Sequence, residues 1–276
     1  MKLVYQAEDQ SLSLFFLLTF TISWLIPGMV LLLGIIFDFD VPIAEYSILY
    51  YLMVWSPSIS AVILNWLNYG WEGVEKFFTR ILDIARYGRI YVWILFGVSG
   101  MNLLAALLTN ISGTPAFKIP QGPWLPIFWA GLWKFTAGPW EEPGWRGFAL
   151  PRLQDRMDGL RASVFLGLIW GIWHVPAYVI GMGVLNRTYF GGLSWILLRF
   201  FVEIVSESII LTYIYNQTQG SIPHCMFFHG MMNFPYPWEL DVDISTAQSG
   251  LLLIGAILIV LLKRDSYNFD LETDIP

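Results

Sequence analysis

The sequence predicts an all-α, polytopic membrane protein with about eight transmembrane helices around an intramembrane polar cavity. Of its 276 residues, 56% are hydrophobic and only 13% are charged, whereas soluble domains carry about 25% charged residues. Apolar runs long enough for a span, which needs about 20 residues, recur along the whole chain. Carboxylates and histidines fall inside some of these runs, which is why we expect the helices to enclose a polar cavity.

The apolar runs define the expected elements in chain order. We expect spans at residues 12–37, 46–68, 90–110, 124–142, 162–183, 192–215, 221–236 and 247–262. The first run is too long for a signal-peptide core, so we expect it to be retained. The fourth and seventh are short and contain proline, and they also hold most of the polar residues of interest. Without an internal repeat or linker, residues 1–276 form one membrane domain, with a motif-bearing core at about 120–240.

The distribution of charge predicts the orientation. With eight spans, the loops on one side carry eleven Lys and Arg residues and those on the other side carry two. Basic loops stay in the cytoplasm, so we expect both termini there. The net charge of -6 argues against a nucleic-acid partner, which would require a basic surface. The single cysteine, Cys225, excludes an internal disulfide framework.

The stretch Glu141-Glu142-Pro143-Gly144-Trp145-Arg146 places two acids and a base at the end of the fourth span. An ionisable residue at membrane depth is expensive and indicates a functional site. In a helix, Glu142 and Arg146 share a face, while Glu141 points about 100° away. We therefore expect Glu142 and Arg146 to hold the structure and Glu141 to do chemistry. The alternative is a pair of acids at a solvated helix end.

Pro139 and Pro143 bracket the two glutamates, and each proline removes a backbone hydrogen bond from a helix. Irregular backbone at membrane depth is tolerated where it lines a cavity or is buried in protein. We favour this interpretation over a helix that simply ends in the interface.

All three histidines of the chain lie in two spans. His229 and Asn233 are four residues apart and share a helical face, whereas His224 faces elsewhere. At about 1.5 Å per residue, a helix ending near Leu150 and another starting at Ser221 would place both Glu142 and His229 about 12 Å from the cytoplasmic side. With His174 in the fifth span, these residues are able to meet in one site. A hydrogen-bonded packing role is the alternative for any one histidine.

A further polar stripe follows the sixth span, where Arg199, Glu203 and Glu207 recur every four residues. We favour an internal salt ladder that holds helices together. The alternative is an ion or substrate path, as a transporter would need.

Taken together, the motifs resemble those of the CAAX-protease and bacteriocin-processing family of intramembrane proteases. That family carries a Glu-Glu-x-x-x-Arg motif, an aromatic-x-x-x-His motif, and His-x-x-x-Asn or Asp. The corresponding residues here are Glu141, Glu142 and Arg146, then Trp170 and His174, and finally His229 and Asn233. One departure is Trp170, where the eukaryotic prenyl-protein members usually carry phenylalanine, and it puts prenylated substrates in doubt.

The resemblance implies a glutamate-type endopeptidase at the cytoplasmic side of a prokaryotic-type cell membrane, acting on a membrane protein or lipid-modified peptide. No cofactor is expected. Peptide hydrolysis needs an activated water and donors for the developing oxyanion. Glu141 is suited to act as the base with His174 orienting the water, while His229 and Asn233 are suited to donate to the oxyanion.

Zinc is the competing mechanism, with Glu141, His174 and His229 as its ligands. The sequence lacks a His-Glu-x-x-His helix and Asn233 is an uncommon ligand, so we favour a metal-free site. Two other classes stay open, namely a non-catalytic scaffold or bacteriocin self-immunity protein and, less favoured, a transporter.

Overall fold

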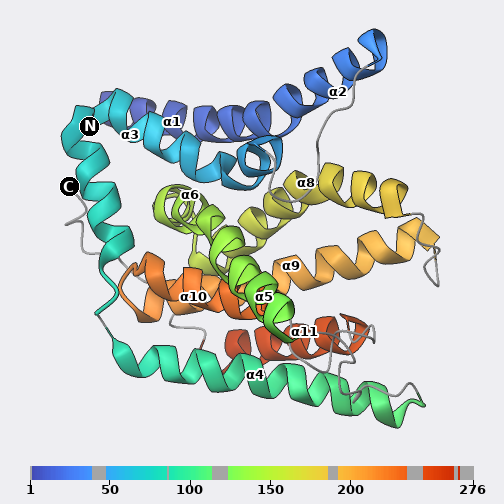
Figure 1. The fold of residues 1–276 in the computed structure, drawn as a ribbon. Helices are drawn as coiled ribbons and strands as arrows, with labels where there is room; N and C mark the ends of the chain where they lie inside the picture. Colours follow the sequence, from blue (N-terminus) through green and yellow to red (C-terminus); the bar gives the residue numbers. More distant parts are fainter. Residues whose placement is uncertain are drawn as a thin grey trace.

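The computed structural model describes residues 2–38, 48–85, 87–113, 124–185, 192–234, 245–263 and 267. All regular structure in these ranges is helical, which confirms the predicted class (Figure 1). In chain order the elements are α1 (Lys2–Phe20), η1 (Thr21–Leu25), α2 (Ile26–Phe37), α3 (Ile48–Leu82), α4 (Gly88–Ile111), α5 (Trp124–Ala137), η2 (Gly138–Glu141), α6 (Glu142–Gly144), η3 (Trp145–Ala149), α7 (Leu150–Gln154), α8 (Gly159–Leu185), α9 (Gly192–Gln217), α10 (Ile222–Asn233) and α11 (Ser245–Leu262).

Three helical stretches of the described residues are long and apolar enough to cross a membrane. They are Ser11–Phe37, Ile48–Leu82 and Gly88–Ile111, and Thr246–Leu262 is apolar but shorter. A helix also lies within each of the eight ranges that the sequence marked as spans. Four basic residues that contribute to the predicted orientation, Arg86, Lys118, Arg187 and Arg264, lie outside the described residues.

Helix α3 differs from its prediction, because it continues to Leu82 instead of ending near residue 68. It breaks at Gly70, whose φ of 63° is readily adopted by a residue without a side chain. Beyond the break, Val74, Phe77 and Ile81 are buried at helical spacing. The basic residues between them made this stretch too polar to be read as a span, although one face of it packs into the core.

The helices form a bundle in which the segment η2–α7 lies at the centre (Figure 1). Helix α3 packs along α1 and also contacts η2 and α6, while α10 contacts α4, α5 and η2. Helices α8 and α9 pack closely through two small residues. A side-chain carbon at Gly167 would lie 2.9 Å from Ser208, and one at Gly171 would lie 2.7 Å from Phe201. Small residues four apart allow this approach, as is common between membrane helices.

Candidate active site

The motif-bearing segment, residues 138–154, is one continuous helical path with changing geometry. It passes from the 3₁₀ turn η2 through α6 and the π-helix η3 into α7. Helical irregularities of this kind are frequent at functional sites and have identifiable causes. Pro139, Pro143 and Pro151 each lack the amide hydrogen that a regular helix uses. The helix therefore does not end at the glutamates, as the interfacial alternative required, but continues to Gln154.

Side chains of α3 replace the hydrogen bonds that the motif segment loses. The hydroxyl of Ser58 donates to the carbonyl of Trp140 and accepts from the amide of Gly144 at 3.2 Å. It is therefore inserted into the position of a normal helical bond between residues four apart. The Trp55 indole donates to the carbonyl of Ala137 at 3.0 Å. Sequence reasoning missed these two residues, although polar groups beside Pro57 in an apolar run were a signal.

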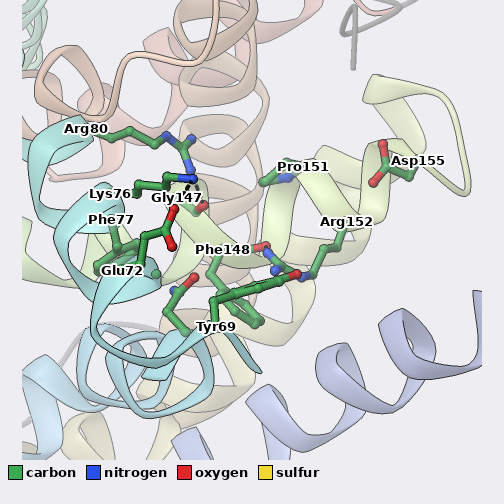
Figure 2. Close-up of a pocket in the computed structure, with 12 residues that line it drawn as sticks. Tyr69, Glu72, Lys76, Phe77, Arg80, Gly147, Phe148, Pro151, Arg152 and Asp155 are labelled. Atoms are coloured by element: carbon green, nitrogen blue, oxygen red, sulfur yellow. Dashed lines mark hydrogen bonds and ion pairs between the residues drawn. The ribbon is translucent and has the colours of Figure 1, made fainter. Parts of the chain in front are cut away.

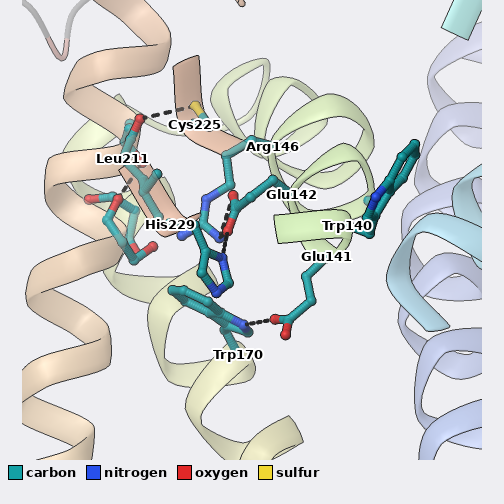
Figure 3. Close-up of polar contacts among 12 residues, drawn as sticks. Trp140, Glu141, Glu142, Arg146, Trp170, Leu211, Cys225 and His229 are labelled. Atoms are coloured by element: carbon teal, nitrogen blue, oxygen red, sulfur yellow. Dashed lines mark hydrogen bonds and ion pairs between the residues drawn. The ribbon is translucent and has the colours of Figure 1, made fainter. Parts of the chain in front are cut away.

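Glu142 lies at the centre of a fully buried ion cluster (Figure 3). Its carboxylate is 3.1 Å from Nη1 of Arg146, the neighbour four residues on that the sequence predicted. It also lies 2.7 Å from Nδ1 of His229, which α10 contributes. The Arg146 guanidinium stacks 4.4 Å from the centre of the Trp170 ring. An arginine and a histidine thus share one buried carboxylate, and losing one member of such a cluster typically costs about 3–5 kcal/mol.

Glu141 faces a different helix, α8, as its predicted offset along the helix requires (Figure 3). The Trp170 indole donates to Oε2 of Glu141 at 2.8 Å. His174 Nε2 lies 4.0 Å from the same oxygen, and His174 Nδ1 bonds the carbonyl of Trp170 at 2.9 Å. Tryptophan at position 170 therefore orients the carboxylate with an N–H group that phenylalanine does not have.

His229 and Asn233 meet next to Gly138, at the start of the motif segment. A side-chain carbon at Gly138 would lie 2.4 Å from Nδ2 of Asn233 and 3.6 Å from Nε2 of His229. Asn233 is exposed, in contrast to the buried His229. The structure thus brings the predicted residues of three separate helical segments together around Gly138 and the two glutamates.

His224 lies elsewhere, as predicted. Its ring stacks on Tyr91 at a centroid distance of 3.9 Å and bonds the Ser221 hydroxyl at 2.8 Å. It therefore has the packing role that is the common alternative for a lone histidine.

The salt ladder expected along α9 stays a prediction. Glu203 accepts a hydrogen bond of 2.7 Å from Ser249 of α11. Glu207 follows one turn further on and is partly exposed. The backbone of Arg199 lies in α9, but its side chain is outside the described ones. Glu203 thus also contacts α11, a relation that spacing along a single helix was unable to predict.

The zinc alternative names Glu141, His174 and His229. Among the described residues, no group of three or more His, Cys, Asp and Glu side chains has an arrangement that fits a metal ion. Nδ1 of His229 is directed to Glu142 instead of Glu141. The metal-free site stays a prediction, and its test is given below.

A separate pocket of about 340 Å³ lies between α3 and the end of the motif segment (Figure 2). Its lining residues include Lys76, Arg80, Gly147 and Arg152, and none of the six predicted site residues. Arg80 lines it and donates to the carbonyl of Gly147 at 3.1 Å and to the Tyr215 hydroxyl at 3.2 Å. This pocket is therefore distinct from the candidate active site, although Arg80 supports the segment that carries it.

Fold and site together define the class of protein: a helical membrane protein with a buried cluster of glutamates, histidines and arginine. Comparison with known proteins finds similarity to one family. The model of a family described as "Type II CAAX prenyl endopeptidase Rce1-like" matches residues 123–235, a range that contains all six predicted site residues. A similar protein is "CAAX prenyl protease 2" of Methanococcus maripaludis, 24% identical over 271 residues, which cover 92% of this chain and 94% of the relative.

These two matches confirm the resemblance seen in the motifs. Over residues 123–235 the chain matches the Rce1-like CAAX endopeptidase family, and it is a membrane protein with apolar helices.

Proposed function

We propose that this protein is an intramembrane endopeptidase that hydrolyses a peptide bond near the cytoplasmic side of the membrane, with water activated by Glu141 and His174. The observation that carries the proposal is the pairing of a buried Glu141 with His174 at 4.0 Å. This is too long for a direct hydrogen bond, and one water between the two groups would bond to both.

The hydrogen bonds around His174 favour this role. A carbonyl oxygen only accepts, so the bond between Nδ1 and the Trp170 carbonyl requires the hydrogen on Nδ1. In the neutral ring Nε2 is then a bare acceptor directed toward Glu141. A water between them is able to lose its proton to the Glu141 carboxylate while Nε2 orients it.

His229 and Asn233 are suited to stabilise the oxyanion that forms when this water attacks. Both present nitrogen atoms beside Gly138, where a side chain would displace Asn233. Preorganised donors at such a position typically contribute about 2.7–4 kcal/mol each to transition-state stabilisation. Glu142 and Arg146 serve to hold His229 in place.

For the topology, we propose eight spans with both termini in the cytoplasm and a polar cavity at the six residues. The basic bias of eleven against two supports the orientation. The helices found in all eight expected ranges support the number of spans.

The name of the relative points to a substrate class, a protein with a C-terminal prenylated CAAX sequence. The test is cleavage by the purified full-length protein in vesicles, with matched peptides that carry or lack the prenyl group, and with products identified by mass. We expect cleavage inside the CAAX sequence. A well-folded protein that cleaves neither peptide would favour a scaffold or self-immunity function.

The same preparation tests the metal. We expect full activity from protein that elemental analysis finds free of transition metal. One zinc per chain, removed together with activity by a chelator and restored with it, would establish the zinc mechanism instead.

A further inference from the structure

A groove of about 660 Å³ lies between α4 and α11, with residues of α9 and α10 completing its lining. Figure 1 shows α4 and α11 side by side at one edge of the bundle. Trp93 of α4 and Leu258 of α11 line the groove and are exposed, so it opens on the outer surface of the helices. Its volume is in the range of about 300–1,000 Å³ that is common for ligand sites. The described residues that line it include none of the six predicted site residues, so the proposed function gives it no role.

Helices α4 and α11 pack tightly at one end of the groove. Ala105 and Ala106 of α4 pack against Ala247 of α11. Beside them, Nε2 of Gln248 donates to Oδ1 of Asn102 at 2.9 Å. Small residues allow such close contact between membrane helices. The contact joins the last part of α4 to the start of α11, so the two helices run in opposite directions and the groove is closed there.

Beyond this contact, three glycines leave the groove open. A side-chain carbon at Gly97 or Gly100 of α4, or at Gly255 of α11, would contact nothing within 4 Å outside its own stretch of helix. All three glycines line the groove. The open space is therefore due to missing side chains, and larger residues at these positions would fill it.

The lining of the groove is suited to a hydrocarbon chain. None of the described residues that line it is charged, and most are Ile, Leu, Val, Met or Phe. On α4 the groove extends from Ile90 to Leu104, which corresponds to about 21 Å of helix. The hydrocarbon core of a bilayer is about 30 Å thick, so a lipid chain in one leaflet spans about 15 Å. A single lipid chain therefore fits along the groove.

Two basic residues lie at the end of the groove opposite the tight contact. Arg89 is four residues before Trp93 on α4 and therefore shares a helical face with a residue that lines the groove. Lys263 is four residues after Ile259, another lining residue, whose carbonyl accepts the Lys263 amide hydrogen at 2.8 Å. Both basic side chains are exposed, and neither forms an ion pair with another described residue. Positive charge at the end of an apolar groove is complementary to a lipid with a negative headgroup.

We propose that the groove between α4 and α11 binds one chain of an anionic phospholipid, whose headgroup phosphate is held by Arg89 and Lys263. The bound chain fills the space that the three glycines leave, and it stabilises the packing of α4 and α11 because it binds only the folded protein. The proposal rests on the shape and charge of these helices and does not depend on the proposed function.

The test measures which lipid the full-length protein retains. The protein is reconstituted in vesicles of equal amounts of phosphatidylglycerol and phosphatidylcholine with identical chains. It is then extracted in mild detergent, and the mass of the intact complexes identifies the bound lipid. One double variant, Gly97→Leu with Gly255→Leu, fills the groove, and the other, Arg89→Gln with Lys263→Gln, removes the two charges.

Each double variant has a matched control. Gly28→Leu adds the same side chain at a glycine of α2 that is also open within 4 Å but does not line the groove. Arg161→Gln removes an exposed basic residue of α8 that pairs with Asp158 at 3.1 Å.

We expect wild type and both controls to retain one phosphatidylglycerol per chain. The variant with the filled groove should retain neither lipid. In the charge variant, the preference for phosphatidylglycerol should fall about 5-fold for each basic residue removed, the factor that a Lys or Arg near a membrane surface typically contributes. Because Arg89 and Lys263 are exposed, the charge variant provides the test if the leucine variant does not fold.

The proposal would be overturned if wild type retains no lipid, if it retains the two lipids equally, or if both double variants retain phosphatidylglycerol as wild type does. Displacement of the lipid by an equimolar prenylated peptide would also overturn it, because the groove would then belong to the substrate. Cleavage is not measured here, so a failure of the proposed function leaves the result of this test unchanged.

Discussion

At the scale of single residues, Gly138 and Gly144 lie on either side of the glutamates and contact very different neighbours. A side-chain carbon at Gly138 would meet the end of the Asn233 side chain at 2.4 Å. One at Gly144 would meet the backbone of Pro57 in α3 at 2.2 Å. An exposed side chain is able to move aside, whereas packed backbone is not, and the two glycines should therefore respond differently to the same substitution.

Gly138→Ala should retain the melting temperature but lower turnover about 100-fold or more, because Asn233 is displaced from the candidate oxyanion position. Asn233→Ala should reproduce that loss.

Gly144→Ala should destabilise the fold by about 1–3 kcal/mol or more, since α3 must separate from the motif segment. Thermal unfolding and cleavage rate on the three purified variants provide the check. Normal turnover in Gly138→Ala would show that the oxyanion is not bound beside Gly138.

Contacts between residues close together in the sequence were predictable, whereas contacts between distant positions were not. The pairing of Glu142 with Arg146 was predicted because spacing of four along a helix fixes which side chains meet. The bond from His229 to the same carboxylate was not, since it joins positions 87 apart in the chain. The Trp170 indole bond to Glu141 was likewise invisible, because the motif specifies only an aromatic residue there.

At the scale of elements, the sequence predicted that Glu142 and His229 lie at the same depth and are able to meet. They do meet, although the helix ends assumed for that estimate were wrong. The motif helix continues to Gln154 and α10 begins at Ile222. By counting, Glu142 would then lie about 18 Å from its helix end and His229 about 10 Å. The residues nevertheless touch, since the His229 ring bonds the Glu142 carboxylate at 2.7 Å. Helix positions are readable from hydropathy, but relative depth is set by packing.

Arg80 links three elements, since α3 carries it and its guanidinium bonds the η3 backbone and the α9 residue Tyr215. Hydrogen bonds from charged groups typically contribute about 1.5–3 kcal/mol, and Arg80 is partly exposed. We expect Arg80→Met to lower stability by about 1–3 kcal/mol.

Lys76→Met is the control for this prediction, one turn earlier on the same helix. Lys76 pairs with Glu72 at the surface, where the two side chains are 47% and 76% exposed. Such a pair contributes about 0–1 kcal/mol. Urea or thermal unfolding of both variants measures the difference, and equal stabilities would show that Arg80 is not a link between the elements.

At the scale of the whole molecule, composition and hydropathy were sufficient to predict the class and the order of the helices. The order of the motifs was sufficient to recognise the resemblance to a family whose model matches residues 123–235. The break in α3 at Gly70 and the support of the motif by Trp55 and Ser58 were not predictable in this way. They depend on which helices become neighbours, and hydropathy carries no such information.

The proposed topology predicts that residues near Asp40 and Arg156 lie on opposite sides of the membrane. The natural Cys225 is buried, so it should react little with a membrane-impermeant thiol reagent. Single cysteines introduced near the two positions in intact cells should differ, with only the one near Asp40 labelled from outside. If both introduced cysteines are labelled from the same side, the eight-span topology is wrong.

The most direct test of the proposed chemistry is the division of roles between Glu141 and Glu142, adjacent acids of identical type that face different partners. Glu141→Gln keeps a side chain able to accept from the Trp170 indole, and Glu142→Gln leaves Arg146 buried without its counter-charge. We predict that Glu141→Gln keeps its melting temperature and loses cleavage, whereas Glu142→Gln loses about 3–5 kcal/mol of stability. The test measures the cleavage rate and the melting temperature of Glu141→Gln, Glu142→Gln and wild type. Retained cleavage in Glu141→Gln, or equal loss of stability in both variants, would contradict the account.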